Sequence, residues 1–234
     1  MRGAQHVLVT APSALELLEQ RHGPIAGASV VPQGFDELVA RRAVRQPEWR
    51  SDGGLQLLYA GTFYAFRDPR SLVEAVVAGR GVSLSIASGN VPDWLVDLAV
   101  AHPDKLVLLG SVPHRELLAL QRESDVLVNL ANIDPCQVPG KLYEYFGACR
   151  PILHLSQAPN DASGALLSRL RRGWACGNDL ASVARMLDAL AEAHGRGCLE
   201  AGLQLGLESV QSWSWTASAR RVERILLGVA DTVR

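Results

Sequence analysis

The sequence predicts a doubly wound α/β fold built on a parallel sheet. From residue 55 onward, short apolar runs alternate with amphipathic segments, a pattern typical of parallel sheets covered by helices on both faces. The chain has 234 residues, of which 48% are hydrophobic and 20% charged, so it can bury a full core. Ligands of such sheets bind at the carboxyl ends of the strands, so the loops that follow the strands are the candidates for function.

The first 53 residues predict a small unit and a connector. Residues 7–9 form a short strand, and a helix follows from Pro12 to the residues before Gly23. We expect the inward face of this helix to consist of Leu15, Leu17 and Leu18. Residues 30–31 are again extended, and a polar, arginine-rich connector then continues to a boundary near Gly53.

After this boundary the expected elements alternate regularly. We expect strands at residues 55–60, 82–87, 106–109, 126–130 and 152–155. We expect helices at residues 69–77, 92–100, 114–122, 140–148, 162–171 and 180–193. A last helix has a serine or threonine N-cap and an apolar face formed by Ala219, Val222, Ile225 and Leu226. This face packs either on its own domain or on another one.

Composition excludes several classes of function. The formal charge of −1 provides no basic stripe for a nucleic-acid backbone. The cysteines have neither paired spacing nor nearby histidines, so we expect no zinc site and no disulfide framework: Cys136, Cys149, Cys176 and Cys198. A signal-peptide core is absent, as is an apolar run of the roughly 18 residues that span a bilayer. We therefore expect a cytoplasmic protein with at most peripheral contact at the inner membrane face.

The stretch from residue 134 to 153 contains the first candidate site. It predicts a loop closed by Pro139 and Gly140, then a short helix with Lys141 at its N-terminus and Glu144 one turn later on the same face. The lysine and the free amides of a helix N-terminus could hold a phosphate, while the carboxylate accepts hydrogen bonds from a sugar hydroxyl. The alternative is an exposed surface ion pair with no role in binding.

The loop after the strand at residues 55–60 contains the second candidate site. Gly61 allows close approach of a phosphate, Thr62 offers a hydroxyl and an amide, and Arg67 can bind an oxyanion bidentately. The alternative for Gly61 is an ordinary strand-to-helix turn. Dinucleotide and Walker glycine motifs are absent. No carboxylate stands in a fixed relation to His114, so we expect this histidine to flank a helix rather than act as a base.

Six segments, in their order and separations, resemble the C-terminal nucleotide-sugar-binding domain of GT-B glycosyltransferases, in particular the retaining family-4 group. This domain has a Rossmann-like sheet, and the resemblance covers nearly the whole chain. The segments are Val-Val-Pro-Gln-Gly-Phe-Asp at 30–36, Leu-Tyr-Ala-Gly-Thr at 58–62, Leu-Gly-Ser-Val-Pro at 109–113, Ser-Asp-Val-Leu-Val-Asn-Leu at 124–130, Val-Pro-Gly-Lys-Leu-Tyr-Glu-Tyr at 138–145 and Ser-Trp-Thr at 214–216.

The resemblance assigns roles to the candidate residues. Glu144 corresponds to the second glutamate of the family's Glu-x7-Glu motif, which bonds the donor ribose. The first glutamate, which contacts the transferred sugar, falls on Cys136, although a subgroup with a Pro-x-Lys-x-x-Glu loop manages without it. Arg67 lies near the phosphate-clamping lysine of the family, and Val112 lies beside the base. The diphosphate is met by Gly61 and Thr62 and by the helix start at Gly140, Lys141 and Leu142.

The resemblance also divides the chain into four parts. Residues 1–33 are a remnant of the N-terminal GT-B domain, and residues 34–53 are the interdomain linker. Residues 54–211 form the nucleotide-sugar-binding domain, and residues 212–234 form a helix that crosses back to the N-terminal domain. The chain thus corresponds to a donor-binding half, whose acceptor half could be a separate polypeptide.

The function implied is binding of a nucleoside-diphosphate sugar for hexosyl transfer to a glycan, a lipid-linked acceptor or a small molecule, as in polysaccharide biosynthesis. Neither a metal nor a cofactor is expected, and no catalytic residue is predicted. One alternative is a non-catalytic, degenerate domain that binds a nucleotide or a partner without turnover. Another is a nucleotide-sugar epimerase on the same fold, for which the chain offers no convincing acid–base set.

Overall fold

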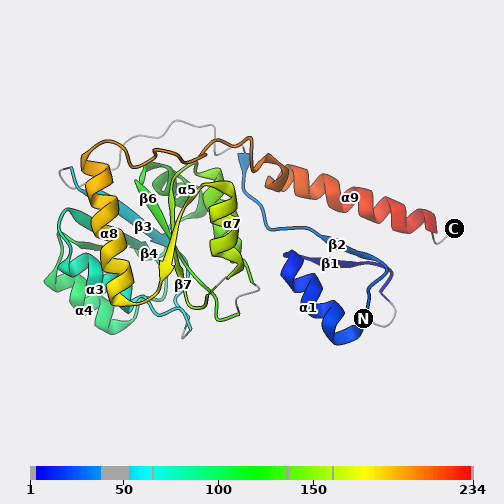
Figure 1. Ribbon diagram of the computed structural model, residues 1–234, viewed down its shortest axis with the longest axis horizontal. Helices are drawn as coiled ribbons and strands as arrows, with labels where there is room; N and C mark the ends of the chain where they lie inside the picture. Colours follow the sequence, from blue (N-terminus) through cyan, green and yellow to red (C-terminus); the bar gives the residue numbers. More distant parts are fainter. Residues whose placement is uncertain (1–3, 38–52, 65, 135–136, 160, 233–234) are drawn as a thin grey trace.

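The computed structural model describes residues 4–37, 53–64, 66–134, 137–159 and 161–232. Most of the predicted linker at residues 34–53 lies outside these ranges, as does Cys136. The described chain forms a large α/β domain and a smaller, elongated part that contains both ends of the chain (Figure 1).

The large domain is organised around a parallel sheet of six strands (Figure 1). The strand order is β5-β4-β3-β6-β7-β8, and every described pair is parallel. The strands are β3 (Leu55–Ala60), β4 (Val82–Ala87), β5 (Leu106–Leu108), β6 (Val126–Leu130), β7 (Ile152–Ser156) and β8 (Gly173–Gly177). The predicted doubly wound sheet is therefore confirmed, and β8 is an additional strand that the sequence did not indicate.

Helices cover both faces of this sheet and enclose two hydrophobic cores. One core lies beneath α3 (Arg70–Ala78), α4 (Asp93–Ala101) and α8 (Leu180–Gly195). The other lies beneath α5 (His114–Glu123), α6 (Gly140–Gly147) and α7 (Ala162–Leu170). Each observed helix starts and ends within about two residues of its predicted bounds, because the apolar residues recur at the helical period.

The strand order places a topological switch point between β3 and β6. From β3 the chain first continues outward to β4 and β5, and it then returns to the other side of β3 with β6, β7 and β8. The crossover connections therefore diverge at this point, which is where ligands of doubly wound sheets generally bind. Both candidate loops, after β3 and after β6, begin there.

Residues 7–30 form a small βαβ unit. Strands β1 (Val7–Val9) and β2 (Ala28–Val30) pair in parallel, and α1 (Pro12–His22) connects them. No residue of α1 is fully buried, and the predicted inward-facing residues Leu15, Leu17 and Leu18 are half-buried, whereas Glu16 and Gln20 are exposed. These leucines are only half-buried because a two-stranded sheet is too narrow to cover a helix face.

Two segments far apart in the sequence run side by side between the two parts of the molecule. The amide of Phe35 donates to the carbonyl oxygen of Trp213 at 3.2 Å, and the amide of Trp215 donates to that of Phe35 at 3.0 Å. The Phe35 side chain is buried against α6, where a Cβ on Gly147 would lie 2.8 Å from the Cβ of Phe35. A short 3₁₀ turn (Gln211–Trp213) leads into α9 (Trp215–Thr232), which extends alongside the βαβ unit (Figure 1).

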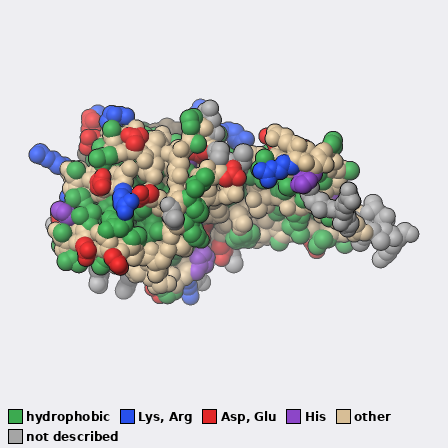
Figure 2. Space-filling view, turned by 90° about the horizontal axis from the view of Figure 1, so that it is seen from below, with side chains coloured by type: hydrophobic (Ala, Val, Ile, Leu, Met, Phe, Trp, Pro, Cys, Tyr) green, Lys and Arg blue, Asp and Glu red, His purple; other side chains and the backbone are tan. Residues whose placement is uncertain are grey.

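The described helices and the face in Figure 2 can be compared with what a membrane protein or a nucleic-acid-binding protein requires. None of the described helices is both long enough and apolar enough to cross a lipid bilayer. Figure 2 shows acidic and basic side chains interspersed over the visible face, without a broad area of one charge. This distribution agrees with the near-neutral net charge of the sequence.

Candidate functional site

Tyr145 connects the elements that form the switch point. Its side chain reaches from α6 to the carboxyl ends of β3 and β6, where its hydroxyl accepts from the amide of Ala60 at 3.0 Å. The hydroxyl lies 3.3 Å from the carbonyl oxygens of both Ala60 and Val128, so it can donate to either. Burial raises the pKa of Tyr145 well above its usual value, so the hydroxyl keeps its proton. This residue fixes the helix that contains Lys141 and Glu144 against the two central strands.

The loop after β3 is held in place by hydrogen bonds to its neighbours. The amide of Gly61 donates to the carbonyl oxygen of Ala87 at 3.1 Å, and the Tyr59 hydroxyl donates to that of Thr62 at 3.2 Å. Asn90, which follows β4, accepts from the amide of Phe63 at 3.0 Å and donates to its carbonyl oxygen at 2.6 Å. Thr62 is exposed, and these hydrogen bonds hold its loop in place at the carboxyl end of the central strand β3.

Arg67 connects the loops after β3 and β6. Its Nε donates to Oδ1 of Asn132 at 3.1 Å, and its Nη2 donates to the same oxygen. The guanidinium also lies 5.2 Å from the ring centroid of Tyr64 and 5.8 Å from that of Phe66. These contacts hold a half-buried positive charge at the switch point, as anion binding requires.

Lys141 and Glu144 form the predicted same-face pair. Nζ of Lys141 lies 2.8 Å from Oε1 of Glu144, and Nε2 of Gln121 donates to the same oxygen at 2.5 Å. The lysine and glutamate side chains are 28% and 17% exposed, so the pair is not the fully solvated surface contact of the alternative interpretation. Because both donors meet Oε1, the second carboxylate oxygen can accept hydrogen bonds from a ligand.

The remaining predicted residues lie in segments that follow the carboxyl ends of the strands. Gly140 starts α6 and packs near Gln33, whose Cγ would lie 3.3 Å from a Cβ at the glycine. Leu142 is fully buried, and its amide donates to the carbonyl oxygen of Pro139 at 3.0 Å, so its N–H is already occupied. Val112 is half-buried against the apolar core beneath α5, α6 and α7.

The two charged groups face different hollows. Arg67 lines a hollow of about 400 Å³ with Tyr64 and Trp94, and Glu144 lines one of about 10 Å³ with Phe35 and Gln121. These two hollows share no residue. Both charges nevertheless act on the Tyr145 hydroxyl, whose pKa Glu144 raises and Arg67 lowers. Both groups are therefore within electrostatic range of the Tyr145 hydroxyl, although they line separate hollows.

Sequence reasoning missed the polar partners of these charges. Asn132 follows the strand at the switch point by two residues, and that position could have indicated a ligand-facing amide. Gln121 is buried in α5 and gave no signal, because nothing in the periodicity of a helix shows which polar residue meets a carboxylate. In the described ranges, no three His, Cys, Asp or Glu side chains gather closely enough to hold a metal ion.

Solved structures with similar folds are glycosyltransferases. Sucrose-phosphate synthase from Thermosynechococcus elongatus superposes with a TM-score of 0.71 at 18% identity, over 98% of this chain and 59% of that one. A glycosyltransferase from Rickettsia africae gives a TM-score of 0.75 at 13% identity, over 96% and 63%. Anabaena HepE in complex with UDP and glucose gives 0.73 at 11% identity, over 97% and 64%.

The chain has the fold of a GT-B C-terminal domain. It spans less than two thirds of the length of these three glycosyltransferases. No family model matches the sequence, and no curated protein matches it. The GT-B assignment therefore rests on the fold.

Proposed function

We propose that this chain binds a nucleoside-diphosphate sugar and takes part in hexosyl transfer to a glycan, a lipid-linked acceptor or a small molecule. The observation that supports this proposal best is the placement of Arg67 and of the Lys141–Glu144 pair beside Tyr145, at the switch point of the sheet. Anabaena HepE, which has a similar fold, binds UDP and glucose in its structure.

Each charged residue has a role in the proposed complex. Arg67 and Lys141 neutralise the diphosphate, together with the unpaired amides at the start of α6. Glu144 accepts hydrogen bonds from the two ribose hydroxyls through the oxygen that Lys141 and Gln121 do not use. Stabilisation of the departing diphosphate by these cations needs no metal ion in this proposal. Because the site recognises ribose and phosphates, the identity of the base depends on the loop that contains Val112.

Replacement of Glu144 by alanine tests the proposed donor site. We expect the Kd for UDP, GDP or ADP, whichever binds the parent chain most tightly, to rise about 10- to 100-fold, since a charge-assisted hydrogen bond contributes about 1.5–3 kcal/mol. Isothermal titration calorimetry measures this change. Glu116→Ala removes an exposed carboxylate from the first turn of α5 and serves as the matched control. If Glu144→Ala and the parent chain bind the nucleotide with equal affinity, Glu144 is not part of the nucleotide-binding site.

We also propose that α9 and the βαβ unit pack against an acceptor-binding domain, in this chain's full-length protein or in a separate polypeptide. Trp215, Val222, Leu226 and Leu227 of α9 line an apolar groove of about 650 Å³ together with Val31. Leu226 and Leu227 are each 61% exposed, and an apolar strip of this kind is a typical interaction surface. One of the similar structures is, by its name, a complex of GtfA and GtfB.

Introduction of a charged side chain into this groove should impair sugar transfer but not donor binding. We expect sugar transfer only when the polypeptides encoded beside this chain are added, and we expect Leu226→Glu to reduce that transfer at least about tenfold without changing nucleotide affinity. Arg221→Glu changes an exposed residue of α9 outside the groove and should keep full transfer. Transfer by the chain alone, unaffected by Leu226→Glu, would contradict a docking role for α9.

A further inference from the structure

A large cavity lies at the edge of the sheet, beyond the proposed donor site. It has a volume of about 940 Å³ and opens at the carboxyl ends of β7 and β8. Gly164 and Ala165 in the first turn of α7 form one wall, and Phe66 and Asp68 from the loop after β3 also line the cavity. Phe66 and Asp68 flank Arg67 in sequence, so this cavity adjoins the proposed donor site without including its charged residues.

The charge of the lining decides which ligands can enter. The described lining residues include Asp68, Asp161 and Asp179 but no lysine, arginine or histidine. The amide of Ser182 donates to Asp179 at 2.9 Å and lowers its pKa, so this carboxylate stays ionised. Asp68 is paired with Arg70, and Asp161 with His154. The described lining therefore offers no cationic side chain that could bind a phosphate, in contrast to the arginine and lysine of the proposed donor site. Cys176 also lines the cavity, and burial raises the pKa of its thiol to about 11, so it is not a reactive thiolate.

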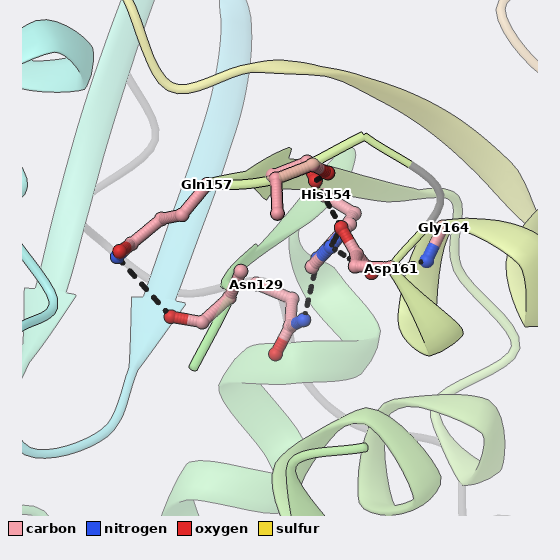
Figure 3. Close-up of polar contacts among 8 residues, drawn as sticks. Asn129, His154, Gln157, Asp161 and Gly164 are labelled. Atoms are coloured by element: carbon pink, nitrogen blue, oxygen red, sulfur yellow. Dashed lines mark hydrogen bonds and ion pairs between the residues drawn. The ribbon is translucent and has the colours of Figure 1, made fainter. Parts of the chain in front are cut away.

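The wall formed by α7 is held rigidly by a buried hydrogen-bond network (Figure 3). Nδ1 of His154 lies 2.7 Å from Nδ2 of Asn129, and Nε2 of His154 lies 3.0 Å from both carboxylate oxygens of Asp161. Asp161 in turn accepts from the amide of Gly164 at 2.8 Å and so caps α7. The network links β6, β7 and α7, and Figure 3 shows it beside Gln157. Because this wall is already ordered, ligand binding costs no conformational entropy for ordering it.

The other lining groups suit a ligand that is rich in hydroxyl groups. Gly164, Ala165, Ala175 and Gly177 are small and leave space for a ring-shaped molecule. Carboxylate and amide oxygens accept hydrogen bonds from hydroxyl groups, and Asp179 and Gln157 present such oxygens on exposed side chains. The carboxylate of Asp68 already accepts from the amide and the guanidinium of Arg70. Phe66 is 36% exposed and offers an apolar ring surface to the C–H groups of a ligand. Within the described chain no cluster of metal ligands is present, so the carboxylates do not form a metal site.

We propose that this cavity binds a neutral sugar through its hydroxyl groups and is a second carbohydrate site, separate from the donor site. The inference goes beyond the proposed donor binding and does not depend on it, because no residue of the lining belongs to the predicted donor set. A neutral sugar at this position would lie next to the loop that contains Arg67. An acceptor or a product glycan could therefore be held beside the donor.

Titration of the whole isotope-labelled chain with sugars, without nucleotide, tests this proposal by NMR. We expect glucose, galactose, mannose, N-acetylglucosamine or maltotriose, at up to about 50 mM, to shift the amide signals of Gly164, Gly177 and Asn178. Glucuronate, which is anionic, should not shift them. The proposal is overturned if none of the five sugars shifts these signals, or if glucuronate shifts them as strongly as a neutral sugar does.

Two variants on one face of α7 provide the matched comparison. Ala165→Trp fills the cavity from an exposed helix position and should weaken sugar binding at least about tenfold. Ser168→Trp adds the same side chain to an exposed position of α7 that does not line the cavity, and it should bind as the parent chain does. Equal sugar binding by Ala165→Trp and Ser168→Trp would show that the sugar does not bind in this cavity. Glu144→Ala should lose nucleotide affinity but keep these sugar-induced shifts, so failure of the donor proposal and failure of this one are distinguishable.

Discussion

Replacement of Arg172 by methionine is expected to lower the free energy of unfolding by about 3–5 kcal/mol. The Arg172 side chain is completely buried, and burial lowers its pKa. Its Nη1 donates to the carbonyl oxygens of Gln204 and Gly206, at 3.1 and 2.7 Å, and its Nη2 donates to those of Leu205 and Phe146, at 2.9 and 2.8 Å. Methionine fills similar space but leaves four carbonyl groups without this donor. A fully buried unpaired group costs about 1–3 kcal/mol, and three of these four contacts are only partly buried, so each contributes less than that full cost.

Urea denaturation followed by circular dichroism measures this loss. Arg196→Met is the matched control, because Arg196 is 65% exposed and its ion pair with Glu192 contributes little. Arg172→Lys keeps the charge but cannot reach four carbonyl groups in one plane, so we expect it to recover only part of the loss. A change of less than about 1 kcal/mol in Arg172→Met would show that the carbonyl groups find other partners.

The position of Arg172 explains why its loss should also reach the site. It ties residues 204–206 to α6, the helix that contains Lys141 and Glu144. The same segment continues into the 3₁₀ turn and α9, so Arg172 fixes the start of the crossing to the smaller part of the molecule. The sequence shows only an arginine directly after the predicted helix at residues 162–171, and it gives no indication of burial.

The parallel sheet could be predicted because its strands are nearly continuous apolar runs. The one strand that the sequence did not predict, β8, shows the limit of that signal. β8 has the sequence Gly-Trp-Ala-Cys-Gly and lies at the edge of the sheet, where its residues are exposed or half-buried. A strand covered on fewer sides needs fewer apolar residues, so it lacks the expected pattern. The same reason, incomplete cover, explains why the leucines of α1 are not buried.

Within the candidate site, only contacts between residues close in the sequence could be predicted. Lys141 and Glu144 are three residues apart, so helical geometry alone placed them together. The contact between Gln121 and Glu144 joins residues 23 apart, and that between Arg67 and Asn132 joins residues 65 apart. Contacts of this range depend on the crossovers of the sheet, which fix the loops relative to one another, and no local pattern encodes them.

Asp161 is expected to contribute strongly to stability in its ionised form, and Asp161→Ala should lower the free energy of unfolding by about 2–4 kcal/mol. The substitution removes the N-cap of α7, worth about 1 kcal/mol. It also leaves buried His154 without its acceptor and Ser156 without one of its two, at a cost of about 1–3 kcal/mol. With a proton on Nε2, the His154 ring donates to Asp161 and accepts from Asn129, so the loss extends along the network.

The same contacts predict how stability changes with pH. Burial would raise the pKa of Asp161, but hydrogen bonds from His154, Ser156 and the amide of Gly164 outweigh it and lower the pKa to about 2. The folded state therefore prefers the carboxylate, and this contribution is complete above the ordinary pKa of about 4 and is lost as the pH falls through about 2. Between about pH 5 and pH 2 the parent chain should lose about 2 kcal/mol through this group.

Urea titrations at several pH values test this dependence with Asp161→Asn, which cannot ionise. We expect the difference in unfolding free energy between the parent chain and Asp161→Asn to shrink as the pH falls, because the parent chain alone loses the carboxylate. Asp188→Asn, at an exposed position of α8, should leave that pH dependence unchanged. A constant difference between the parent chain and Asp161→Asn from pH 5 to pH 2 would show that Asp161 does not stabilise the fold through its charge. The N-cap and the wall of the cavity would then be held by shape and neutral hydrogen bonds alone.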